Sequence, residues 1–161
     1  MTRYDGSDAH DALVLGWWHT LVTTGDLART FMASLHPVGA FLAFWRSPDR
    51  PLLFRADARG LWFAGWFEPM MAGASAGLWA RADYRLTRVG LSAVETFLAT
   101  GLARWPVLIG VTKQEKLLRA HTRLGYTVLG EVPHLWDGER AWVVVLTSAG
   151  FDKRPARHGG T

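Results

Sequence analysis

The chain has 161 residues, 49% of them hydrophobic, with nine Trp, eight Phe, no Cys and a formal net charge of +4 that comes mostly from arginine. This composition argues against a disordered chain and allows one domain with a substantial core, and the lack of cysteine excludes disulfides, thiolate nucleophiles and cysteine-based zinc sites. Because the arginines are scattered and no apolar run reaches the length of a membrane span, we expect no specific nucleic-acid partner and no membrane partner.

Two helices are predicted at the start of the chain. The first covers residues 8–24 with Gly25 as its C-cap, and the second follows Asp26 as N-cap and ends before Pro37. Apolar residues recur at every fourth position in both segments, which places them on one face of each helix. The two stripes are Leu13, Trp17 and Leu21, and Leu27, Phe31 and Leu35.

Three segments rich in aromatic and apolar residues predict a meander of antiparallel strands after these helices. They are residues 38–46, 51–58 and 61–69, and the turns between them fall at the sequences PDR and DARG. The small residues of MMAGASAG, 70–77, predict a loop.

The second half of the chain alternates helices and strands. Helical periodicity over 86–104 precedes the apolar run PVLIGV, 106–111, which predicts a strand buried on both faces. Thr112 and Glu115 predict a capping box for the next helix, and a hairpin around DGER completes the order. We expect PVLIGV to run parallel beside 61–69, a single domain over residues 1–150, and a flexible basic tail over 151–161.

Two short stretches carry the functional prediction. RLTRVG, 85–90, opens the helix before PVLIGV, and the N-terminus of a helix attracts phosphate through its free N–H groups and its dipole. The second stretch, 113–131, predicts a helix that ends at Leu-Gly-Tyr and passes directly into a strand. In that helix His121 shares a face with Leu117 and Leu124, so its side chain should point inward.

The order of these elements, together with the two stretches, resembles the GNAT acyltransferase superfamily over residues 13–147. The resemblance implies an α/β fold, with a mixed, mostly antiparallel twisted sheet flanked by helices. It also implies acetyl-CoA as cofactor and an N-acyltransferase reaction, in which the acyl group passes to an amine acceptor that the sequence does not identify.

In that family the pyrophosphate of acyl-CoA is held by the pattern Q/R-x-x-G-x-G/A, which RLTRVG matches in part. The resemblance gives Arg85 and Gly90 as phosphate-binding residues, while Arg88 stands where the family has its middle Gly. Two interpretations of Arg88 stay open. Its guanidinium either contacts phosphate in place of the backbone or fills the space of the pyrophosphate, in which case acetyl-CoA binding is lost.

A second family pattern, N-x-x-A-x-x-x-Y-x-x-x-G-F, aligns with the stretch 113–131. Gly125 and Tyr126 match its last pair, and Gln114 stands at the Asn that helps to hold the pantetheine. His121 stands at the Tyr that protonates the departing thiolate, a role that histidine can fill near neutral pH. The alternative is a core histidine with a satisfied hydrogen bond.

The resemblance also implies a base that deprotonates the amine. Glu68, the only acid near the end of the segment 61–69, stands in about the right place, and aromatic neighbours in the sequence would suit it to base work. The alternative is a strand-end glutamate that faces water. The histidines show no metal-ligand spacing, so we expect no metal site.

A closer similarity is to small GNAT-like proteins of tailed bacteriophages, including an internal virion or assembly protein family. It rests on the late WF strand, the central helix, PVLIGVTKQE and the LGY…DG hairpin. Two functions therefore stay open: a divergent N-acetyltransferase with a degenerate CoA loop, and a non-catalytic virion or assembly protein that binds phage structural proteins. Either is compatible with a homo-oligomer, and we expect a cytoplasmic location, in the host cytoplasm or the virion if the protein is phage-encoded.

Overall fold

The structure is a computed structural model that describes residues 1–85 and 87–154, and for Trp136 the backbone only. Its strands are β1 (Thr2–Arg3), β2 (Leu52–Asp57), β3 (Gly60–Met70), β4 (Gly73–Ala80), β5 (Val107–Thr112), β6 (Thr127–Trp136) and β7 (Glu139–Thr147). Its helices are α1 (Asp8–Thr24), α2 (Leu27–Thr30), α3 (Val38–Trp45), α4 (Arg88–Leu102), α5 (Leu118–Arg123) and α6 (Ser148–Asp152), with short 3-10 segments η1 (Ala33–Leu35) and η2 (Glu115–Leu117). None of the helices in these described ranges is long and apolar enough to cross a membrane.

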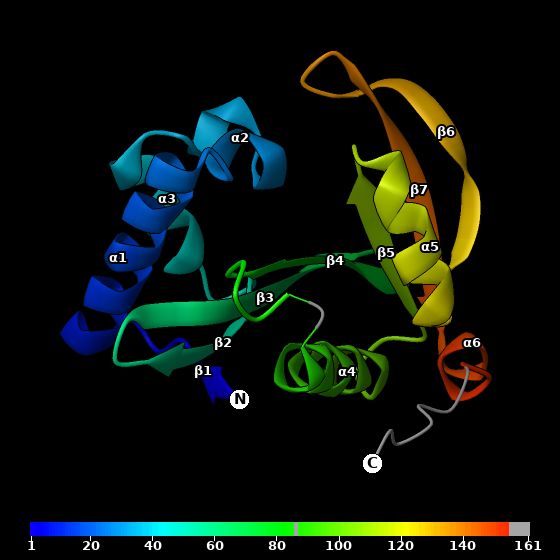
Figure 1. The fold of residues 1–161 in the computed structure, drawn as a ribbon, viewed down its shortest axis with the longest axis horizontal. Coiled ribbons are helices and arrows are strands. Elements are labelled where there is room, and N and C mark those ends of the chain that lie inside the picture. Colours follow the sequence, from blue (N-terminus) through cyan, green and yellow to red (C-terminus); the bar gives the residue numbers. More distant parts are fainter. Residues whose placement is uncertain (86, 155–161) are drawn as a thin grey trace.

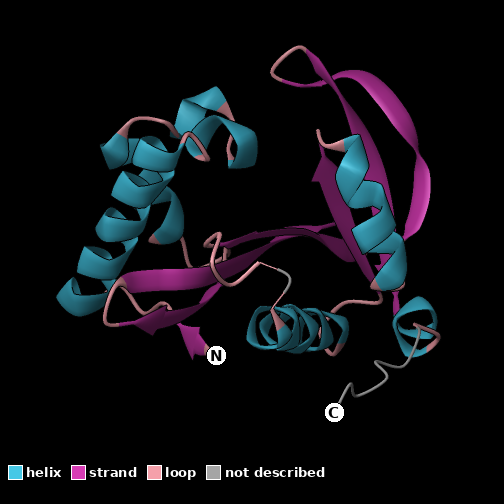
Figure 2. Ribbon diagram, viewed as in Figure 1, coloured by secondary structure: helices cyan, strands magenta, loops and turns pink. Residues whose placement is uncertain are grey.

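The strands form one mixed sheet in the order β1-β2-β3-β4-β5-β7-β6 (Figure 1). Every neighbouring pair is antiparallel except β4 and β5. Helices lie on both faces of the sheet (Figure 2). The fold class predicted from the sequence, a mixed and mostly antiparallel sheet flanked by helices, is confirmed.

Helix α1 has the bounds and the C-cap that its sequence predicts. The Ser7 side chain accepts a hydrogen bond from His10 N–H at its start, and Gly25, with φ of 69°, ends it in the left-handed region. Trp17 and Leu21 are fully buried, as expected for the apolar face. The second predicted helix is only partly present, because α2 ends at Thr30 and is followed by η1.

The prediction of a strand at 38–46 is wrong, because these residues form helix α3. Phe41 and Trp45, four positions apart, are buried against the ring of Trp17 on α1, whereas Val38 is exposed. A run that is apolar at nearly every position has no clear period, so its packing against α1 decides its structure.

The predicted loop at 70–77 is also wrong, because residues 73–80 form strand β4. Its small residues accommodate large neighbours: the indole of Trp66 on β3 occupies the space that a side chain on Gly77 would need. The antiparallel meander is therefore β2, β3 and β4. The run PVLIGV, as β5, is parallel to β4 and not to β3.

Two apolar clusters lie on opposite faces of the sheet. One joins α1 and α3 to β2, β3 and β4, and in it Trp45, Trp66 and Trp79 surround Trp17. The other joins α4 and α6 to β3, β5 and β7 around the stacked rings of Phe67 and Phe97, whose centroids are 4.3 Å apart. Figure 1 accordingly shows α1 and α3 on one side of the sheet and α4 on the other.

The later elements match the predicted order with two differences. The hairpin β6–β7 is confirmed. The capping box is wrong, because the Thr112 side chain accepts a hydrogen bond from Gln114 N–H (3.1 Å) and caps no helix. Helix α6 and the buried Phe151 extend the fold beyond the expected boundary at residue 150, and the rest of the expected tail, 155–161, lies outside the described residues. The predicted helix at 86–104 is α4, and its expected first residue, Leu86, also lies outside them.

Candidate functional site

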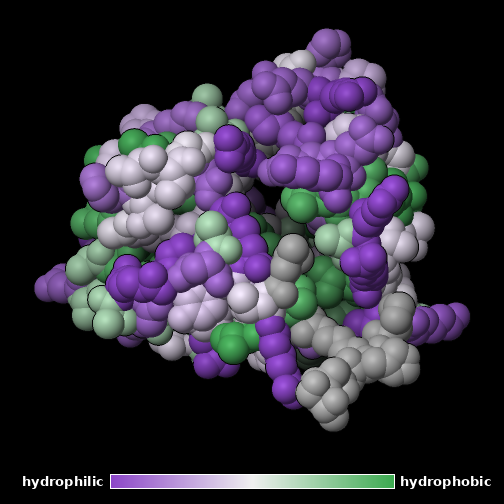
Figure 3. Space-filling model, in the orientation of Figure 1, coloured by the Kyte–Doolittle hydropathy of each residue, from purple (hydrophilic) through white to green (hydrophobic). Residues whose placement is uncertain are grey.

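Strands β4 and β5 diverge soon after they begin. Only Ala74–Leu108 and Ser75–Ile109 are in register, although β4 continues to Ala80 and β5 to Thr112. The far ends of the two strands, 76–80 and 110–112, therefore separate in the middle of the sheet, and we call the region between them the β4–β5 cleft. Figure 3 shows a hollow in the same region, with hydrophilic side chains along its upper rim.

On the edge of β4 that faces this cleft, the backbone N–H and C=O groups of Leu78 have no partner among the described residues. In an antiparallel ladder, successive residues direct their N–H and C=O groups alternately toward and away from the partner strand. Because Arg81 N–H donates to the Trp62 carbonyl of β3 (2.9 Å), Leu78 and Ala80 point the other way, toward β5. The Ala80 carbonyl accepts a hydrogen bond from Arg85 Nε (2.6 Å), but no described residue pairs with the Leu78 backbone on that side.

Helix α4 begins shortly after β4 and offers two further N–H groups. Its N-cap is Thr87, whose Oγ1 accepts a hydrogen bond from Gly90 N–H (3.0 Å). Among the described residues, none accepts a hydrogen bond from the N–H of Arg88 or Val89, and both residues are exposed. These groups and the positive end of a 15-residue helix form a place where an anion can bind.

Gly90 and Arg85 are both engaged within the protein. A Cβ on Gly90 would overlap the carbonyl oxygen of Tyr84, so the close approach of these two backbones requires glycine. Arg85 Nη2 lies 2.5 Å from Asp26 Oδ2, in addition to the bond from its Nε to β4. These contacts give both residues a structural role, and their predicted role as phosphate ligands stays a prediction.

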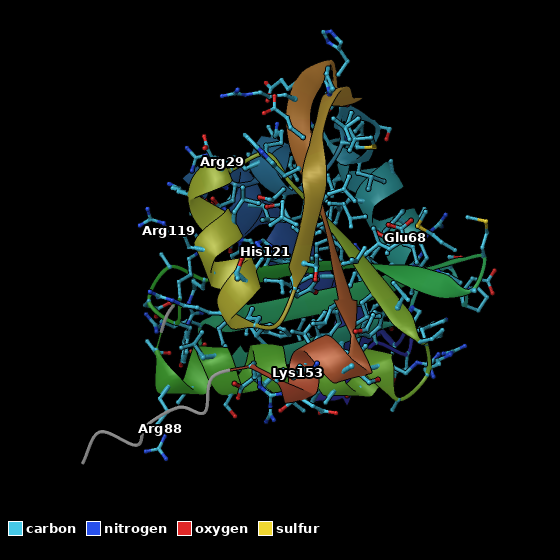
Figure 4. All side chains as sticks on the ribbon, turned by 90° about the vertical axis from the view of Figure 1, so that its right-hand side faces the viewer. Arg29, Glu68, Arg88, Arg119, His121 and Lys153 are labelled. Carbon is cyan, nitrogen blue, oxygen red and sulfur yellow. The ribbon has the colours of Figure 1, made fainter. Side chains whose placement is uncertain are left out.

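Arg88 is the first residue of α4, the place where the family's middle Gly was expected. Its side chain is exposed, and Figure 4 shows it extended away from α4 into solvent. The two interpretations of Arg88, as a phosphate contact and as a residue that fills the pyrophosphate position, both stay predictions.

A cavity of about 500 Å³ opens between α2 and the end of β5. The residues that line it are Arg29, Lys113, Gln114, Glu115 and Lys116. Two contacts join the elements around it: Lys113 Nζ donates to the Ala28 carbonyl, and Ala33 N–H donates to Asp137 Oδ2, each at 3.2 Å. Gln114, the predicted pantetheine contact, is thus part of the cavity wall.

His121 lies on α5 and is half-buried. Its Nδ1 is 2.8 Å from the Leu117 carbonyl oxygen, which assigns the proton to Nδ1, and its ring packs edge-on against Tyr126 at 5.3 Å. Burial lowers the pKa of His121 and raises the pKa of the Tyr126 hydroxyl. His121 therefore has a satisfied hydrogen bond and favours the neutral form, which suits the core alternative better than proton donation.

Glu68 lies away from the open part of the cleft. It is opposite Ser75, at the end of β4 where β4 and β5 are still paired. Its carboxylate is 3.5 Å from Arg50 Nε, and its side chain is 38% exposed. The structure thus gives no support to Glu68 as the base in the cleft, and a partly exposed ion pair describes it better.

The predicted site residues do not converge on one point. Figure 4 shows Glu68 on one side of the molecule, His121 on α5 toward the other side, and Arg88 at the bottom, well below α5. Arg29, Lys113 and Glu115 line the cavity but were not identified as site residues from the sequence. Lys113 carried a signal, since it directly follows a buried strand, a position where ligand-binding residues gather.

No three His, Asp or Glu side chains in the described part of the chain are arranged to hold a metal ion.

No protein-family model matches this chain, and no curated protein matches its sequence. Solved structures do match. A spermidine N-acetyltransferase of Vibrio cholerae has a TM-score of 0.70 at 8% identity, over 94% of this chain and 97% of that one. Mycobacterium smegmatis RimJ in complex with CoA-disulfide has a TM-score of 0.69 at 11% identity, over 94% and 84% of the two chains. An aminoglycoside 6′-N-acetyltransferase in complex with coenzyme A has a TM-score of 0.62 at 12% identity, over 91% and 97%.

These likenesses cover nearly the whole chain at very low sequence identity. They show that the chain has the fold of the GNAT N-acetyltransferases. Sequence similarity this low establishes the fold alone, so the activity has to be argued from the site.

Proposed function

We propose that this protein is an acyl-CoA-dependent N-acyltransferase that moves the acyl group of acetyl-CoA to an amine. The observation that carries the proposal is the β4–β5 cleft, with the unpaired backbone of Leu78 on its edge. The pantetheine arm of CoA is extended and contains two amide groups, so it can add to β4 as a short strand would. Two of the similar structures contain coenzyme A or CoA-disulfide.

The residues around the cleft fit such a cofactor. The N–H groups of Arg88 and Val89 are unpaired among the described residues and suit the pyrophosphate, and the Arg88 guanidinium is free to add a charge-assisted contact. Gln114 lines the cavity from the β5 side, where its amide can bond the pantetheine. Acetyl-CoA supplies an activated thioester, and these residues bind and orient it.

The transfer requires a group that accepts a proton from the amine. The amine nitrogen bonds to the thioester carbon, the carbon–sulfur bond breaks, and the thiolate leaves. Glu115 is the one carboxylate among the residues that line the cavity. We assign proton acceptance to Glu115 in place of Glu68, because a base has to lie within hydrogen-bond reach of the amine.

The proposal is tested by titrating the protein with acetyl-CoA in a calorimeter. We expect micromolar binding, and Arg88→Ala should weaken it by about 1.5 to 3 kcal/mol, as for a hydrogen bond to a charged group. Lys153→Ala is the control, because Lys153 is an exposed cation at the end of α6, and Figure 4 shows it well apart from Arg88. Release of CoA thiol in the presence of an amine would complete the test.

The second candidate is a non-catalytic protein that keeps the fold, such as a phage virion or assembly component. One observation favours it: Arg85, the leading residue of the family's phosphate pattern, is held by Asp26 and Ala80. This candidate predicts no heat and no thermal shift at millimolar acetyl-CoA, and no thiol release with any amine. That result would replace the acyltransferase proposal.

A further inference from the structure

The cavity between α2 and the end of β5 has an excess of positive charge. Arg29, Lys113 and Lys116 line it against a single carboxylate, Glu115. Arg29 comes from α2, and the other residues come from the segment after β5, so the charges face one another across the cavity.

Acidic residues nearby do not remove this excess. Asp26 is buried and accepts hydrogen bonds from Trp79 Nε1 (3.0 Å) and Arg85 Nη2 (2.5 Å), while its distance to Arg29 is 3.6 Å. Glu139 lies 3.2 Å from Lys113, but its side chain is 67% exposed and outside the cavity lining. The charges of Arg29 and Lys116 therefore remain largely available to a ligand.

This cavity is separate from the place proposed for the cofactor pyrophosphate. Figure 1 shows α2 at the top of the molecule and α4 at the bottom. Figure 4, turned about the vertical axis, shows Arg29 near one end of α5 and Arg88 beyond the other end. One ligand phosphate bound at α4 would therefore not contact Arg29 or Lys116 in the cavity.

We infer that the acceptor of the proposed acyl transfer is an amine that also carries a carboxylate or phosphate group, and that the cavity binds this anionic group. Arg29 and Lys116 hold the anion, and Glu115 faces the amine. A cavity of about 500 Å³ is large enough for a metabolite-sized ligand. A polyamine would meet like charges there, which disfavours it as an acceptor. The inference rests on the proposed function for the transfer step, but anion binding can be measured without it.

The test compares O-phosphoethanolamine with ethanolamine, two amines that differ only by the phosphate. We expect the phosphate compound to bind, by calorimetry, at least tenfold tighter than ethanolamine. The double variant Arg29→Gln/Lys116→Gln should lose about tenfold or more of this affinity, since it removes two charge-assisted contacts. Lys153→Gln, which removes one positive charge away from the cavity, should leave this affinity unchanged. Equal affinity for both amines, or equal loss in the control, would overturn the inference.

A second arm separates the acceptor from the cofactor as the source of the anion. In the presence of saturating CoA, binding of O-phosphoethanolamine should persist; its displacement by CoA would assign the cations to cofactor phosphates and overturn the inference. With acetyl-CoA, O-phosphoethanolamine should be acetylated faster than spermidine, and the double variant should abolish that preference. If anion binding depends on Arg29 and Lys116 but no acceptor is acetylated, the acyltransferase proposal fails while the anion site stands.

Discussion

At the residue scale, side-chain and backbone contacts hold the described residues of the turn between β4 and α4 in place. Asp26 is buried and joins the start of α2 to Trp79 on β4 and to Arg85 after it. Gly90 lies against the carbonyl of Tyr84, and Thr87 caps the helix. The glycine of the family pattern is therefore required here by the backbone, whatever binds in front of it.

We predict that Gly90→Ala destabilises the protein by about 1 to 3 kcal/mol, because the new methyl group would overlap the Tyr84 carbonyl oxygen. Gly16→Ala is the matched control, since Gly16 is an exposed helical position where a Cβ meets no atom within 4 Å. That substitution should stabilise α1 by up to about 1 kcal/mol. Urea unfolding of the three proteins measures both effects, and an equal change in the two variants would contradict the overlap.

The assignment of the base gives a second prediction at this scale. Glu115→Gln should lower the turnover of an amine acceptor by about 100-fold without weakening acetyl-CoA, because an amide cannot accept the proton. Glu68→Gln should change turnover by less than about threefold, since Glu68 pairs with Arg50 away from the cleft. His121→Gln should behave like Glu68→Gln. A large loss of turnover in Glu68→Gln or His121→Gln, while Glu115→Gln stays active, would contradict the assignment of Glu115 as the base.

At the element scale, a charged network fixes the segment that leads from β4 into α4. Asp57, at the end of β2, accepts from Arg81 Nη2 (2.6 Å) and from the Tyr84 hydroxyl (3.2 Å). Arg59 in the turn before β3 lies 2.5 Å from Asp83. Two elements far apart in the chain are thus joined beside the N-terminus of α4, where the phosphate is proposed to bind.

This network makes stability depend on pH on the acid side. The hydrogen bonds from Arg81 hold the pKa of Asp57 well below its usual range. An unfolded aspartate titrates near pH 3.9, so the stabilisation is full above about pH 4 and is lost as the pH falls through the lower folded pKa. Asp57→Asn should therefore destabilise the protein near pH 7, and its difference from wild type should shrink toward about pH 2.

Urea unfolding at several pH values measures this difference. Asp49→Asn is the control, because Asp49 is exposed and forms no ion pair with a described residue, so it should match wild type throughout. If the difference in the free energy of unfolding between Asp57→Asn and wild type is constant with pH, the loss of stability comes from altered packing and not from the charge of Asp57.

At the scale of the whole molecule, the sheet behaves as two parts joined by a short seam. On one face β1 to β4 pack on α1 and α3, and β4 is in register with β5 at two residue pairs; on the other face α4 packs across both parts, against β3, β5 and β7. A ligand that forms hydrogen bonds with the Leu78 backbone of β4 would add contacts between β4 and β5 where the two strands are no longer paired. Acetyl-CoA should thus stabilise both parts together.

Amide hydrogen exchange by NMR tests this directly. The Leu78 N–H should exchange quickly in the free protein and become protected with acetyl-CoA, since no described residue accepts a hydrogen bond from it and a ligand in the cleft can. The neighbouring Gly77 and Trp79 amides face β3 and should be protected in both states, so the control lies within the same strand. Protection of Leu78 without ligand would mean that the edge is already closed.

The sequence by itself determined those elements whose signal is local. Helix α1 follows from its four-residue stripe and its glycine C-cap, β5 from a short apolar run, and the last hairpin from a turn that contains Asp-Gly. Each depends on periodicity or on a residue that favours one backbone conformation, so neighbours in the chain suffice. The order of such elements was also enough to predict the fold class.

Only the tertiary structure decided α3, β4 and the composition of the cavity. Residues 38–46 are apolar throughout and became a helix because Phe41 and Trp45 pack on α1, and the small residues of β4 became a strand because β3 supplies the pairing and the bulk. Arg29 and Lys113 line one cavity although about half of the chain separates α2 from β5. No local pattern encodes that meeting, since it results from the way β4 and β5 diverge in the middle of the sheet.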